Sequence, residues 1–172
     1  MSKDARRKLD EMLRDLKLPG VGSCHAEAAS RAEKEGWGFE RFLHHVLDVE
    51  LEQRRQKRLE RVLKSSKLPA GKSMATLDLE RLPVKVRRQL PALIEGGFVD
   101  RGENLLAFGL PGRGKTHLVC ALGAELIQNG YTVHFTPAFA LVQRLLLARQ
   151  TYGLEKELRR LDAFDALIID LC

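Results

Sequence analysis

The chain has 172 residues and a mass of 19.4 kDa, the size of one domain with an added segment rather than of two full domains. Hydrophobic residues make up 44% of the chain and charged residues 30%, which excludes a wholly disordered or collagen-like protein. The stretch 54–67 holds seven bases and one acid, and so accounts for the whole net charge of +6. Such a local basic segment favours a polyanionic partner.

The sequence predicts a cytoplasmic protein that does not cross a membrane. No apolar run approaches the length of about 18 residues that a membrane span requires. Acidic residues interrupt the apolar pattern of the N-terminal segment, which therefore lacks the hydrophobic stretch of a secretory signal. The three cysteines, Cys24, Cys120 and Cys172, are widely spaced and form no CxxC pair, so we expect reduced thiols rather than a zinc site or disulfides.

The N-terminal part of the chain reads as three helices. Apolar residues recur at helical spacing from Leu9 to Leu16, and we expect Pro19-Gly20 to stop this first helix. A short alanine-rich helix is predicted over 23–35. A long helix is predicted to begin at Phe39, because its apolar pattern continues without glycine or proline until Pro69.

The long helix carries a cationic ridge. Arg54, Arg58 and Arg61 lie at i, i+4 and i+7, which places three guanidinium groups on one stripe of the helix. One interpretation is a contact surface for a polyanion. The other is a solvated helix face with internal ion pairs, because Glu50 lies four residues before Arg54. Charge alone leaves both interpretations open.

The remainder of the chain predicts an α/β domain. Small, polar and helix-breaking residues over 65–73 mark a linker, so we divide the chain into a helical domain (1–68), a linker (69–82) and an α/β domain (83–172). Helices are expected over 83–95, 115–128, 138–150 and 154–161, and buried strands over 105–108, 131–135 and 166–169. Strands that alternate with helices are typical of a parallel sheet with flanking helices.

A glycine-rich motif follows the first predicted strand and leads into a helix. It fits G-x-x-x-x-G-K-[ST] and consists of Gly109, Leu110, Pro111, Gly112, Arg113, Gly114, Lys115 and Thr116. The order of strand, loop and helix is the one that a phosphate-binding P-loop requires. Glycines let backbone N–H groups converge on a triphosphate, and the helix N-terminus adds its positive dipole. The alternative is a glycine-rich turn without a ligand.

The chemistry of a P-loop assigns roles to three side chains. Lys115 is expected to reach the β- and γ-phosphates of ATP, and Thr116 to give its hydroxyl to Mg²⁺. An acid at the end of a buried strand completes such a magnesium site. Asp170 follows the apolar run 166–169 and is the candidate for this Walker B position.

The run 105–118 resembles the IstB family, the ATPase helper proteins of insertion-sequence transposition. The resemblance extends to Leu18-Pro19-Gly20, to the segment 37–43 and to the basic stretch from Arg54, and so covers nearly the whole chain. The family's second half shares the AAA+ core of DnaC-like helicase loaders. This resemblance implies a fold with an N-terminal helical domain and an AAA+ P-loop sheet flanked by helices.

The resemblance also implies a function. It implies a self-associating protein that binds ATP and Mg²⁺, binds duplex DNA and delivers it to a transposase. The basic residues on the long helix would then contact DNA phosphates: Arg54, Arg55, Lys57, Arg58 and Arg61. Two alternatives remain: a DnaC-like helicase loader, and a non-enzymatic DNA-binding remnant of such a protein.

The sequence departs from the family after Asp170. The family places a second acid directly after the Walker B aspartate, but Leu171 stands there in this chain. The family's sheet also has one more strand between the P-loop strand and the Asp170 strand. We therefore expect a truncated or frameshifted family member with a gap in its sheet, which binds ATP but lacks the catalytic acid, the sensor residue and the arginine finger.

Overall fold

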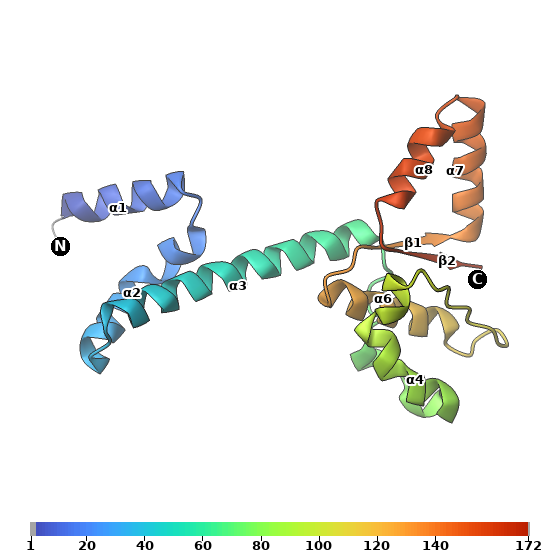
Figure 1. The fold of residues 1–172 in the computed structure, drawn as a ribbon, viewed down its shortest axis with the longest axis horizontal. Coiled ribbons are helices and arrows are strands. Elements are labelled where there is room, and N and C mark those ends of the chain that lie inside the picture. Colours follow the sequence, from blue (N-terminus) through green and yellow to red (C-terminus); the bar gives the residue numbers. More distant parts are fainter. Residues whose placement is uncertain (1–2, 172) are drawn as a thin grey trace. The chain divides into compact units, whose positions relative to one another are not determined.

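The computed structural model describes residues 3–171 (Figure 1). The chain divides into two compact units, and the division in the sequence falls between Arg58 and Leu59. This division lies inside a helix, whereas the sequence places the domain boundary after residue 68. The difference has a physical cause: Leu59, Val62 and Leu68 pack into the hydrophobic core of the second unit.

The first unit is helical. It contains α1 (Lys3–Asp15), α2 (Pro19–Glu35) and the first part of α3 (Phe39–Ser66), around a small core of Leu13, Val21, Ala28 and Val46. The prediction that Pro19-Gly20 stops the first helix is wrong. Helix α1 already ends at Asp15, and Pro19 begins α2, because proline lacks only an N–H group that the first helical turn leaves unbonded. No helix in residues 3–171 has both the length and the apolar character of a membrane span.

The segment that follows α3 is short and structured. The expected linker contains two 3₁₀ turns, η1 (Met74–Thr76) and η2 (Leu79–Arg81). Helices α4 (Val84–Glu95) and α5 (Gly97–Asp100) come next. Leu90 of α4 is buried, and Leu93 and Ile94 pack against the core of the second unit, as the predicted apolar face of this helix requires.

A parallel pair of strands forms the centre of the second unit. Strands β1 (Val133–Pro137) and β2 (Ala166–Asp170) pair in register from Val133↔Ala166 to Pro137↔Asp170. Helix α6 (Lys115–Gln128) packs on the face that carries Val133 and Ile168. Helices α7 (Ala138–Gln150) and α8 (Leu154–Asp162) connect the strands and lie side by side (Figure 1). This arrangement confirms an α/β unit with a parallel sheet.

The segment 105–108 is not a buried strand, contrary to the sequence prediction. It has no regular secondary structure, and the exposed fractions of Leu106 and Phe108 are 72% and 87%. A strand is stable only where a neighbouring strand takes up its backbone hydrogen bonds. Among residues 3–171 the sheet consists of β1 and β2, and the P-loop segment has no strand beside it.

Candidate nucleotide site and basic surface

The glycine-rich motif forms an exposed loop that ends at the first turn of α6. Gly112 and Gly114 have φ angles of 73° and 80°, in the left-handed region that favours glycine. Gly114 is the N-cap of α6, and Lys115 is the first residue of the helix. The first N–H groups of a helix have no intrahelical acceptor, so this loop presents backbone donors next to the positive end of the helix dipole.

The side chain of Lys115 folds back over this loop. Its Nζ donates a hydrogen bond to the carbonyl oxygen of Leu110, at 3.0 Å. Five residues separate the two groups, so the contact spans the loop that the motif forms. The ammonium group therefore lies at the loop itself, where a bound polyphosphate would meet it.

Thr116 and Asp170 meet at the end of the sheet. The Thr116 hydroxyl lies within hydrogen-bonding distance of both carboxylate oxygens of Asp170, at 3.2 and 3.1 Å, and donates to this carboxylate. The two residues are 54 positions apart in the sequence. The fold thus brings together the two side chains that the sequence assigns to Mg²⁺. A hydroxyl next to a carboxylate is an oxygen donor set of the kind that Mg²⁺ prefers.

A close contact between α6 and the sheet holds these two groups together. A Cβ atom added at Gly123 would lie 2.7 Å from the Cδ1 atom of Ile168. A side chain at this position would have to push the end of the Ile168 side chain aside, so glycine suits the close approach of α6 to β2. Since Ile168 is two residues before Asp170, the same approach sets the position of the strand end against the first turn of α6.

The expected linker docks on α6 beside this site. The Oγ1 atom of Thr76 and the Nε2 atom of His117 lie 3.1 Å apart, and His117 Nε2 lies 3.3 Å from the carbonyl oxygen of Ser73. The backbone N–H of Ser73 donates to Thr76 Oγ1 at 3.1 Å, as in a capping box. Sequence reasoning did not find this docking. The spacing Ser73-x-x-Thr76 is the only local signal for it.

Cys120 is a buried residue of α6 near Lys72 and Asp170, and its burial makes its thiol unreactive. It is fully buried, and burial raises its pKa to about 11, an effect that nearby Lys72 opposes and Asp170 reinforces. The structure describes Cys24 and Cys120 as free thiols, as expected, while Cys172 lies outside the described residues.

Arg54 of the cationic ridge is part of an internal ion pair. Its Nε atom lies 2.7 Å from Oε1 of Glu50, and its Nη2 atom donates to the carbonyl oxygen of Lys17 at 2.7 Å. Glu50 is only 3% exposed and accepts hydrogen bonds from the N–H groups of Gly20 and Val21, at 2.6 and 3.2 Å. Arg54 therefore helps to hold α3 against the start of α2. The other basic residues that the sequence assigns to DNA are exposed on α3: Arg55, Lys57, Arg58 and Arg61.

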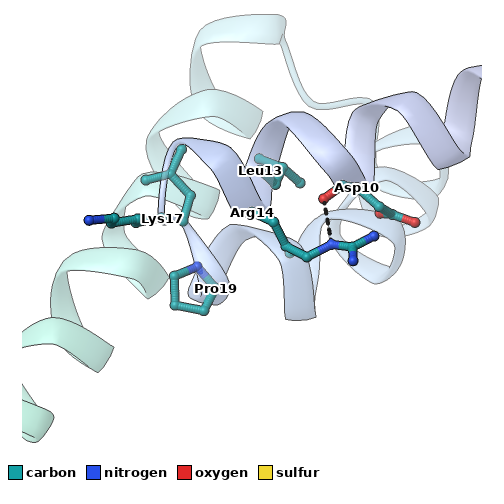
Figure 2. A pocket seen from close by; sticks show the side chains of 7 residues that line it. Asp10, Leu13, Arg14, Lys17 and Pro19 are labelled. Carbon is teal, nitrogen blue, oxygen red and sulfur yellow. Dashed lines mark hydrogen bonds between the residues drawn. The ribbon is translucent and has the colours of Figure 1, made fainter.

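A pocket of about 590 Å³ lies next to this ion pair in the first unit (Figure 2). Leu13, Leu18 and Pro19 form its apolar part, and Arg14 and Lys17 contribute basic groups. Arg14 donates through Nε to the carbonyl oxygen of Asp10, while Lys17 points the other way in this view (Figure 2). Arg14 and Lys17 lie far from the cationic ridge in the sequence, so the spacing of the ridge arginines gave no sign that these two bases line a pocket.

Comparison with known proteins identifies the family. The family described as IstB-like ATP binding protein matches residues 11–172. A protein named as an insertion-sequence ATP-binding protein in Sinorhizobium fredii is 40% identical over 95% of this chain and 55% of its own length. Similarly named proteins of insertion sequence IS5376 in Geobacillus stearothermophilus and IS21 in Pseudomonas aeruginosa are each 34% identical.

The matches cover nearly all of this chain but only part of each relative. The alignment with the Geobacillus protein covers 96% of this chain and 66% of the relative, and that with the Pseudomonas protein covers 95% and 62%. The chain thus spans between about half and two thirds of the length of these relatives. Because the family match includes the helical unit, the P-loop and the Asp170 strand, the chain belongs to the family of IstB-like ATP-binding proteins.

Proposed function

We propose that this chain binds ATP together with Mg²⁺ at the P-loop. The observation that carries this proposal is the contact between Thr116 and Asp170, which joins the P-loop helix to the end of β2. The N–H groups of the loop from Gly109 to Gly114 and the Lys115 ammonium would hold the phosphates. The Thr116 hydroxyl and the Asp170 carboxylate would hold Mg²⁺, which neutralises phosphate charge when it is bound.

Within residues 3–171, the position directly after Asp170 holds no group that would activate water for hydrolysis. Leu171 directly follows Asp170 and is exposed, and its side chain cannot accept a proton. General-base assistance of this kind contributes about 10²–10⁴-fold to an enzymatic rate. We therefore expect the chain to bind ATP and to hydrolyse it slowly. Titration with ATP tests whether the chain binds ATP. Measurement of phosphate release from ATP by the same protein tests whether hydrolysis is slow.

The second part of the proposal concerns DNA. The relatives are named as insertion-sequence proteins, and the basic residues on α3 suit contacts with a phosphate backbone. We assign this role to Arg55, Lys57, Arg58 and Arg61, and we expect Arg54 to contribute less because Glu50 already neutralises it. In this account the protein binds duplex DNA, associates with further copies of itself and delivers the DNA to a transposase.

A salt series tests the DNA contact. If four bases on α3 each neutralise one phosphate, the logarithm of the DNA affinity falls against the logarithm of the salt concentration with a slope of about −4. Replacing Arg55 and Arg58 together by glutamine should weaken binding by about tenfold and reduce this slope by about 2. Fluorescence anisotropy with a labelled duplex measures both quantities.

The matched control is the pair Arg87→Gln and Arg88→Gln, which removes the same charge from exposed positions on α4. We expect its affinity and slope to stay close to those of the unchanged chain. A slope near zero in the unchanged chain, or equal losses in the two double variants, would contradict a specific contact through α3.

A further inference from the structure

A second cavity lies on the face of the sheet opposite the P-loop helix. Its volume is about 350 Å³, and His134, Thr136, Pro137, Ala140, Arg144 and Lys67 are among the residues that line it. Side chains alternate along a strand, so His134 and Thr136 point away from the face where Val133 packs against α6. The cavity is therefore separate from the proposed ATP site.

His134 is the unexplained group in this cavity. Its side chain is buried, with an exposed fraction of 1%, and its ring stacks on Phe164 with the ring centres 4.8 Å apart. Within residues 3–171, neither ring nitrogen has a hydrogen bond of good geometry, although the backbone of Ser65 lies close enough to affect the pKa of His134. A buried ring nitrogen without a hydrogen bond of good geometry costs free energy, which a ligand in the cavity would offset.

The charges around His134 are mainly positive. Arg144 of α7 and Arg160 of α8 each lie 2.9 Å from the same carboxylate oxygen of Glu157, and Lys67 also lines the cavity. One carboxylate thus pairs with two cations, and Lys67 adds a third positive charge to the cavity. Burial lowers the pKa of His134, as do Arg160, Arg144 and Lys67, while a backbone interaction with Ser65 opposes them. Glu157 offsets only one of the three positive charges of Arg144, Arg160 and Lys67, so these groups leave a net positive charge near the imidazole of His134.

Helix α7 adds a further positive contribution. Pro137 is its N-cap and makes no side-chain hydrogen bond to the first turn, and both Pro137 and Ala140 line the cavity. The N–H groups of this turn have no intrahelical acceptor, and the helix dipole is positive at this end. Lys67, Arg144, His134 and the start of α7 therefore converge on one space, which is the arrangement that recognises an oxyanion.

We propose that this cavity binds a phosphate group. In the bound state the oxyanion accepts hydrogen bonds from Lys67, from Arg144 and from a ring N–H of His134. The phosphate comes either from a nucleic-acid backbone or from a small phosphorylated molecule, and the two sources share this chemistry. A second phosphate site in the unit that also carries the P-loop lets one unit hold two phosphorylated ligands on opposite faces of its sheet.

The test is a titration of the full chain with inorganic phosphate at constant ionic strength, with sodium chloride as the matched salt. Histidine ring resonances in NMR spectra report the two sites separately, because His117 lies in the first turn of the P-loop helix α6 and His134 lies in the cavity. We expect saturable changes at His134 in the millimolar range of phosphate. We also expect phosphate to raise the pKa of His134, because a bound anion favours the charged imidazolium.

Lys67→Gln should weaken the response of His134 to phosphate by about tenfold, since it removes a charge-assisted hydrogen bond. Lys64→Gln is the matched control, because it removes the same charge from an exposed position at the end of α3 and should leave the response unchanged. Both lysines are exposed, so neither substitution is expected to disturb the fold. Comparison of the unfolding midpoints of the two variants checks this.

A short single-stranded thymidine oligonucleotide distinguishes the two sources. Changes at His134 with the oligonucleotide at far lower concentration than with inorganic phosphate would identify a nucleic-acid backbone as the ligand. Changes with inorganic phosphate alone would identify a small phosphorylated molecule. The proposal is overturned if His134 shows no saturable change with either probe, if chloride produces the same change, or if Lys67→Gln and Lys64→Gln respond alike.

Discussion

Replacing Lys115 with alanine is expected to weaken ATP binding by about 100-fold. The Lys115 ammonium lies at the P-loop, where its Nζ already bonds to the Leu110 carbonyl oxygen at 3.0 Å. A phosphate oxygen would replace this neutral acceptor with a charged one, and charge-assisted hydrogen bonds are about twice as strong as neutral ones. Loss of two such bonds corresponds to about 2.8 kcal/mol of binding free energy.

Isothermal titration with ATP measures this effect directly. Lys85→Ala is a suitable control, because Lys85 is exposed on α4 in the same unit and lies outside the motif. We expect the control to bind ATP as the unchanged chain does. If Lys115→Ala also bound ATP with unchanged affinity, the glycine-rich loop would be a turn without a ligand, and the nucleotide assignment would fail.

Replacing Glu50 with alanine is expected to destabilise the first unit by about 2–4 kcal/mol. Glu50 is buried and accepts the N–H groups of Gly20 and Val21, which have no side-chain cap from Leu18 at the start of α2. Alanine leaves both N–H groups without an acceptor, at about 1–3 kcal/mol for each buried group. It also removes the partner of Arg54, which is half exposed and can turn to water at little further cost.

The single tryptophan of the chain reports this unfolding. Trp37 lies in the first unit, where its indole N–H donates to Glu35, so its fluorescence in a urea titration follows that unit. Glu52→Ala is the control: Glu52 is an exposed carboxylate two residues further along α3, and its loss should change stability by less than about 0.5 kcal/mol. Equal stabilities of the Glu50 and Glu52 variants would show that the buried carboxylate contributes nothing.

The same contact has a pH signature. Burial raises the pKa of Glu50, but hydrogen bonds from Arg54, Val21 and Gly20 outweigh burial and hold this pKa below its ordinary value of 4.5. A carboxyl whose pKa is lower in the folded state stabilises the fold above the unfolded-state pKa. This stabilisation is lost as the pH falls from 4.5 through the folded-state pKa. We expect the loss to be smaller in Glu50→Gln, which has no charge to titrate.

The sequence predicted the helices well because each has a strong apolar period or clear end signals. Helix α7 begins and ends at the predicted residues, 138 and 150, and α6 likewise matches the prediction. The pattern failed at 105–108, where an apolar run predicted a strand. Periodicity and composition describe only the segment itself, whereas a strand also requires a neighbour, and the described part of the sheet offers none beside this segment.

The candidate site could be predicted in its components but not in its contacts. The motif identified Thr116, and the apolar run before Asp170 identified the acid, but only the fold shows that the two side chains are 3.1 Å apart. For Arg54, the pair with Glu50 follows from their spacing of four residues. The contact between Glu50 and Gly20 depends on how α2 packs against α3, which the local sequence does not encode. This contact shows that Arg54 has a structural role, where the sequence alone left its role undecided.

The magnesium dependence of ATP binding tests the central claim most directly. Isothermal titration of the full chain with ATP, in Mg²⁺ and in EDTA, compares the two affinities for the unchanged chain and for Asp170→Asn. If Thr116 and Asp170 hold the metal, Mg²⁺ should tighten ATP binding of the unchanged chain by about tenfold or more, and should have little effect on Asp170→Asn. An ATP affinity that is the same in Mg²⁺ and EDTA, or an equal effect of Mg²⁺ on both proteins, would contradict the account.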